Sequence, residues 1–112
     1  MKKEVEELLL DIVSDIFELF LDCPDYNLKG QITRTAVYLK SNLVVAEKEH
    51  DEYSYKNYLK TLDELKTLIF VSYKLEVISL EDKNRLEEKL LNLSKMSINI
   101  YNKIDKWYEC EV

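Results

Sequence analysis

Glycine and proline are nearly absent from this chain, because each occurs only once in 112 residues. Strand-rich folds need these residues at their turns, whereas long helices exclude them from their interiors. The deficit therefore predicts an all-α protein with few connections. At this length we expect one domain over residues 1–112, folded as an antiparallel up-down four-helix bundle.

Histidine and cysteine are also scarce, which excludes most metal sites and most forms of nucleophilic catalysis. His50 is the only histidine, lies in an acidic stretch and has no partner at metal-ligand spacing. Cys23 and Cys110 form neither a disulfide framework nor a metal site, and neither has a nearby histidine base. A single glycine, Gly30, cannot form a phosphate-binding loop. We therefore expect no enzyme: no catalytic residue, no metal, no cofactor and no small-molecule substrate.

Long apolar runs are missing as well. The first apolar segment is interrupted by acidic residues from Glu4 to Asp15, which excludes a signal peptide or a membrane span. We therefore expect a cytoplasmic protein with reduced thiols and no membrane partner. The net charge of −6 repels nucleic acid overall, so any such contact needs a local basic patch.

The spacing of the apolar residues predicts four helices, over residues 3–21, 28–47, 52–76 and 80–107. Ser79 is a plausible N-cap for the last helix, which we expect to continue to Trp107. The expected inward residues of the second helix are Leu28, Ile32, Thr35 or Ala36, Leu39, Leu43 and Ala46. Those of the third are Tyr55, Leu59, Leu62, Leu65, Ile69 and Tyr73, and those of the fourth are Leu86, Leu90, Leu93, Ser97, Ile100, Ile104 and Trp107.

The first two helices carry more apolar surface than one bundle core needs. A surface helix usually shows one apolar stripe, but several large side chains here fall outside it. They are Leu10, Phe17, Leu21, Val37, Tyr38, Val44 and Val45. Such a surplus usually marks an interface, so these residues predict a homo-oligomer. The alternative is that neighbouring loops cover them.

One segment is locally basic. Residues 27–46 contain Lys29, Arg34 and Lys40 and no acid, and Lys48 follows closely. These four cations are the candidate contacts for RNA or for a protein partner. On a helical wheel Lys29 and Lys40 share a side, while Arg34 points elsewhere.

The second helix also carries a resemblance. Its segment Gln31-Ile32-Thr33-Arg34-Thr35-Ala36-Val37 through Asn42-Leu43 resembles a Gln-Ile-x-Arg-x-Ala-Val-x-Ile-x-x-Asn-Ile motif. That motif is typical of small bacterial four-helix-bundle proteins, some of which are encoded in intervening sequences of ribosomal RNA genes. The second half is more similar to the accessory variability determinant proteins of diversity-generating retroelements, through Leu62-Asp63-Glu64-Leu65, Leu75-Glu76-Val77-Ile78-Ser79 and Leu93-Ser94-Lys95-Met96.

The resemblance implies a non-catalytic accessory protein. Its relatives form barrel-shaped homopentamers that bind the retroelement's reverse transcriptase and its template RNA. The negative net charge of this chain favours the protein partner over RNA. Two alternatives stay open: a structural or interaction bundle of the ribosomal-intervening branch with no defined ligand, and a helical subunit of a toxin–antitoxin or nucleotide-related system.

Overall fold

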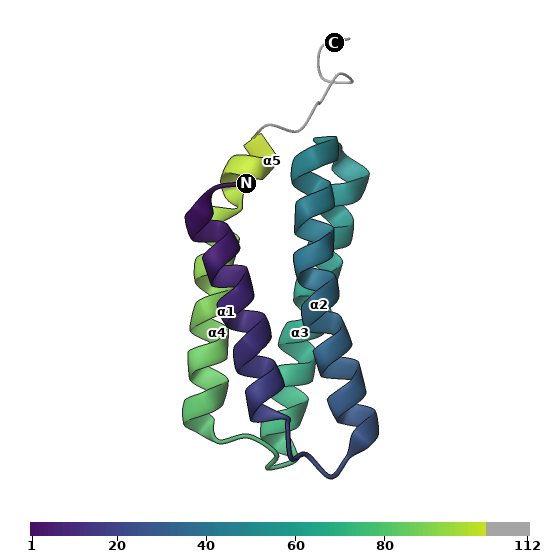
Figure 1. Ribbon diagram of the computed structural model, residues 1–112, viewed down its shortest axis with the longest axis vertical. Coiled ribbons are helices and arrows are strands. Elements are labelled where there is room, and N and C mark those ends of the chain that lie inside the picture. The colour runs from purple at the N-terminus through teal and green to yellow at the C-terminus, as the bar shows by residue number, and fades with distance from the viewer. Residues whose placement is uncertain (103–112) are drawn as a thin grey trace.

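The computed structural model describes residues 1–102 and is a bundle of helices (Figure 1). Four long helices, α1 (Lys3–Leu19), α2 (Tyr26–Glu49), α3 (Glu52–Lys74) and α4 (Leu80–Met96), are followed by the short α5 (Ile98–Asn102). The predicted all-α class is confirmed. In Figure 1 the chain reverses direction at each connection, so that consecutive helices lie side by side. Each helix packs on the next, and α4 returns to pack on α1.

Local capping explains where three of the helices begin. The side chains of Asp25 and Asp51 accept hydrogen bonds from the backbone N–H groups of Leu28 and Ser54, at 3.1 and 2.7 Å. Ser79 caps α4 in the same way, at 3.0 Å from the Asp82 nitrogen, as its sequence context predicts. These caps satisfy orphan donors in the first turns of the three helices.

The core contains most of the residues that were expected to face inward, and we call each such set the seam of its helix. All six expected positions of α2 are buried, with Ala36 rather than Thr35 facing inward, and so are Leu86, Leu90, Leu93 and Ser97. Helix α1 contributes Val5, Leu9, Ile12, Ile16 and Phe20, which recur every three or four residues on one face. One expectation is wrong: Leu59 is 39% exposed, and its neighbour Tyr58 is buried in its place. Tyr73 is only partly buried.

The fourth helix ends earlier than the periodicity predicts. It stops at Met96 instead of continuing to residue 107, and Ser97, directly after its end, makes a tertiary contact. The Tyr58 hydroxyl donates to Ser97 Oγ at 3.1 Å, and Ser97 Oγ donates to the Ser94 carbonyl at 3.0 Å. Burial raises the pKa of Tyr58 to about 12, so this hydroxyl keeps its proton. Ile104 and Trp107 lie outside the described residues.

Candidate functional site

The apolar surplus of α1 and α2 lies on the surface. Leu10, Phe17 and Leu21 are 50%, 47% and 65% exposed. The four residues predicted with them on α2 are exposed too: Val37, Tyr38, Val44 and Val45. In the described part of the chain, the alternative that loops cover these side chains is therefore wrong.

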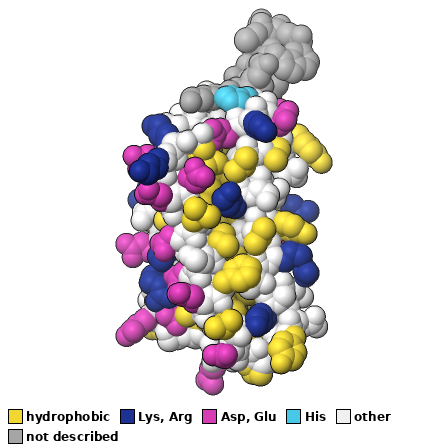
Figure 2. All heavy atoms as spheres, viewed as in Figure 1, with side chains coloured by type: hydrophobic (Ala, Val, Ile, Leu, Met, Phe, Trp, Pro, Cys, Tyr) yellow, Lys and Arg dark blue, Asp and Glu magenta, His cyan; other side chains and the backbone are white. Residues whose placement is uncertain are grey.

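Five of these seven residues form one surface along the line where α1 meets α2. Glu6 of α1 lines a shallow depression together with Lys40 and Val44 of α2. Leu10 and Phe17 follow Glu6 at helical spacing on the same side of α1, and Leu21 lies in the turn directly after that helix. We call the surface made by Leu10, Phe17, Leu21, Val37 and Val44 the α1–α2 face. Figure 2 shows apolar side chains following this line down the molecule.

The remaining two predicted residues sit further round α2. Asn42 turns toward α3, because its Nδ2 donates to Thr61 Oγ1 at 2.7 Å. Tyr38 precedes Asn42 by four residues and Val45 follows it by three, so both lean to the same side. They border the surface between α2 and α3 and do not belong to the α1–α2 face.

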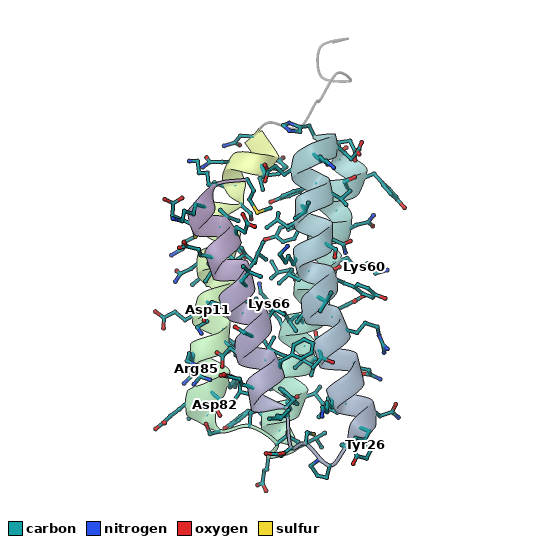
Figure 3. All side chains as sticks on the ribbon, in the orientation of Figure 1. Asp11, Tyr26, Lys60, Lys66, Asp82 and Arg85 are labelled. Carbon is teal, nitrogen blue, oxygen red and sulfur yellow. The ribbon has the colours of Figure 1, made fainter. Side chains whose placement is uncertain are left out.

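On its opposite flank, toward α4, helix α1 carries acidic residues that pair with basic residues of α4. Arg85 of α4 holds Asp15 with two hydrogen bonds, of 2.9 and 3.0 Å, and Lys89 lies 3.0 Å from both Asp15 and Asp11. Asp82 joins the same network through Arg85, at 2.7 Å. Asp11, Asp82 and Arg85 lie along this side of the bundle in Figure 3. We call these five residues the α1–α4 network.

The network fixes the ionisation of its central carboxylate. Burial alone would raise the pKa of Asp15, but the hydrogen bonds and charges of Arg85 and Lys89 outweigh it. The pKa of Asp15 is therefore lower than its ordinary value of 3.8. Burial acts against the charge of Lys89 in the same way, but the hydrogen bonds that Lys89 donates to Asp11 and Asp15, together with their charges, outweigh it and raise the pKa of Lys89.

The four candidate cations do not form one patch. Lys29 Nζ donates to the Leu21 carbonyl at 2.9 Å, which ties the start of α2 to the end of α1. Lys40 and Lys48 line the depression beside Val44. Arg34 lies apart from them, in an open groove between α2 and α3. That groove is also lined by Lys60, Asp63 and Glu64, so its charges balance.

A second apolar surface, not predicted from the sequence, lies between α3 and α4. Its members Leu59, Phe70, Leu80, Leu91 and Ile98 are all exposed. Lys83 of α4 lies 5.9 Å from the Phe70 ring centroid, which places Phe70 beside α4. The other members recur at helical spacing from Phe70 or from Lys83. We call these five residues the α3–α4 stripe. Its signal in the sequence was the apolar residues Phe70, Leu80, Leu91 and Ile98, which lie outside the predicted inward sets.

Other kinds of site find little support in residues 1–102. No three His, Cys, Asp or Glu side chains there come close enough to hold a metal ion. No helix in the same part of the chain has the length and apolar character needed to cross a membrane. A cavity of about 280 Å³ opens at the end of the bundle near α5, where Val5, Met96 and Ile100 form apolar walls beside Glu47.

Comparison with known proteins gives no family. No family model, no curated protein and no solved structure matches this chain.

Proposed function

We propose that this protein is a non-catalytic accessory bundle that self-assembles and binds the reverse transcriptase of a retroelement. The observation that carries the self-assembly is the α1–α2 face, where large apolar side chains stay exposed on two adjacent helices. Monomeric proteins rarely leave such a contiguous surface open to water. The identity of the enzyme partner rests on the sequence resemblance.

The charge of the chain supports a basic protein partner. With a net charge of −6 the molecule attracts a basic surface and repels RNA phosphates. Lys29, Arg34, Lys40 and Lys48 are the proposed contacts for the acidic groups of the partner, and for template RNA if the complex includes it.

A charge-reversal variant tests the partner site. Arg34→Glu combined with Lys40→Glu should weaken binding to the reverse transcriptase encoded beside this gene, measured by titration calorimetry, with helicity unchanged by circular dichroism. Lys3→Glu with Lys56→Glu is the matched control, because it makes the same charge change at exposed positions outside both depressions. An unchanged isotherm for the α2 variant would remove Arg34 and Lys40 from the site.

The separation of the cations favours a second candidate function. Because Arg34 lies in a different groove from Lys40 and Lys48, the candidate cations form no continuous basic track for a nucleic-acid strand within residues 1–102. A structural or interaction bundle with no nucleic-acid ligand fits this arrangement. Binding of the reverse transcriptase that survives every α2 reversal, or no binding at all, would favour this second function.

A further inference from the structure

The α3–α4 stripe is a long apolar row that stays open to water within residues 1–102. Its five members are all exposed, on two helices that pack directly on each other. The row runs along α4, whose 17 residues span about 25 Å at 1.5 Å per residue. Apolar side chains spread over that length match one helix of another polypeptide, laid along the line between α3 and α4.

Lysines outnumber acids beside the stripe, although the whole chain is acidic. A charged residue lies beside a stripe member when it is three or four positions away on the same helix. Five lysines and three acids meet this condition: Lys56, Lys66, Lys74, Lys83 and Lys95, and Asp63, Glu87 and Glu88. Within residues 1–102 the one ion pair among them joins Lys83 and Glu87, at 2.7 Å. The borders of the stripe therefore keep a positive surplus on a chain whose net charge is −6.

Two of these lysines lie against aromatic rings at one end of the stripe. Lys74 Nζ lies 5.5 Å from the ring centroid of Phe70 and 6.0 Å from that of Tyr73. Lys83 Nζ lies 5.9 and 5.5 Å from the same two centroids. Such contacts hold an ammonium group in place and leave its charge unneutralised. A carboxylate of a partner can therefore pair with Lys74 while an apolar neighbour packs on Phe70.

We propose that the α3–α4 stripe binds an acidic amphipathic helix of another protein. Apolar residues of that helix pack along the stripe, and carboxylates beside them pair with Lys66 and Lys74. Charge complementarity supports this occupant, because an apolar row bordered by lysines matches an apolar row bordered by acids. The site is separate from the α1–α2 face, and it does not rest on the proposed self-assembly.

The shape of the charged region favours a helix over an anionic membrane surface. A bilayer is wide, so it would also meet acids beyond the borders of the stripe, such as the exposed Glu81 of α4. It would then be repelled by the negative net charge of the chain. A single helix contacts only the stripe and the lysines beside it.

A synthetic peptide tests the site on the full chain. The probe is a fluorescein-labelled peptide of about 18 residues, long enough to cover α4. It has leucine at every third or fourth position, glutamate beside each leucine and alanine elsewhere. Fluorescence anisotropy should show that it binds the wild-type protein, and that added salt weakens the binding. A scrambled peptide of the same composition should not bind.

Variants of the chain locate the bound peptide. Lys66→Glu combined with Lys74→Glu should weaken binding at least about tenfold, as expected when interface charges are reversed. Lys3→Glu with Lys60→Glu is the matched control and should bind like the wild type. Both of its positions are exposed, and Figure 3 shows Lys60 at the outer edge of the bundle, away from Lys66.

An apolar variant tests the stripe itself. Phe70→Glu should also weaken binding at least about tenfold, because it places a carboxylate in the apolar contact. Circular dichroism verifies that the variant is folded, and Leu91→Glu provides a second substitution in the stripe.

Several outcomes would overturn the proposal. They are a probe that does not bind, a scrambled peptide that binds equally well, and a control variant that loses as much affinity as the lysine variant. Binding of the wild type to vesicles of phosphatidylserine and phosphatidylcholine, lost in the lysine variant, would assign the stripe to a membrane. A lower mass of Phe70→Glu than of the wild type, by light scattering, would assign it to a second copy of this chain. Failure of the proposed self-assembly would change none of these expectations.

Discussion

The two flanks of α1 differ in whether their side chains find partners within the same chain. Toward α4 the helix presents Asp11 and Asp15, which Arg85 and Lys89 neutralise within the chain. Toward α2 it presents Leu10 and Phe17, which remain half exposed. The first flank is complete in a single copy, whereas the second leaves apolar area in water. This difference supports the proposal that another molecule covers the α2 flank.

The largest expected effect comes from placing a charge on the exposed flank. Leu10→Glu should reduce the mass in solution from that of the oligomer to 13.4 kDa, because a buried unpaired carboxylate in the contact is strongly unfavourable. The free energy of unfolding measured on the monomer should change by less than about 0.5 kcal/mol, as for other surface substitutions. A large loss of helicity would show instead that Leu10 supports the fold.

A change on the charged flank should lower the stability of the fold and leave the mass in solution unchanged. Asp15→Asn should lower the free energy of unfolding by about 1–2 kcal/mol, since it leaves Arg85 and Lys89 without their shared carboxylate at a partly exposed site. The mass should not change. Chemical denaturation measures the stability, and Glu4→Gln, which removes a charge from an exposed position of α1 outside the network, is the matched control. Equal losses in both variants would mean that the network contributes nothing specific.

Lowering the pH should gradually reduce the contribution of the α1–α4 network to the free energy of unfolding. Because folding lowers the pKa of Asp15, its contribution to stability is complete above the unfolded pKa and disappears as the pH falls through the folded value. The stability difference between the wild type and Asp15→Asn should therefore shrink as the pH falls from about 6 to about 3. Denaturation curves at several pH values measure it. A difference that stays constant over this range would contradict the lowered pKa.

The smallest effect lies at the turn between α3 and α4, away from both flanks. Glu76 adopts a φ of 62°, and the Val77 N–H bonds to the Ser72 carbonyl at 2.9 Å, as in a Schellman end. Glycine accepts this backbone conformation without strain, so Glu76→Gly should raise the free energy of unfolding by about 0.5–1 kcal/mol. The mass should stay that of the wild type. A destabilised variant would show that the Glu76 side chain has a role of its own.

The sequence predicted those parts of the molecule that depend on local spacing. The seam of α2, the cap at Ser79 and the exposure of Phe17 all follow from residues a few positions apart. The end of α4 at Met96 did not, and the contact beside it, a hydrogen bond between Tyr58 and Ser97, joins residues that are 39 positions apart.

The candidate site was likewise predicted only in part. Its apolar residues were found from the helical period, but their grouping was not. The period leaves Val37 and Tyr38 together outside the seam, whereas the packing of α1 and α3 assigns them to different surfaces. The α3–α4 stripe was missed for a related reason: Leu59 fits the inward spacing as well as Tyr58 does, and only the partner hydroxyl of Ser97 selects the tyrosine.

The central claim is that the exposed flank of α1 is an interface between copies of this chain. The mass of the wild-type protein by size exclusion with light scattering tests it most directly. A salt-resistant species well above 13.4 kDa is expected, and five subunits, as the resemblance implies, would give 67 kDa, five times the mass of one chain. A monomer of 13.4 kDa at every protein concentration would contradict it.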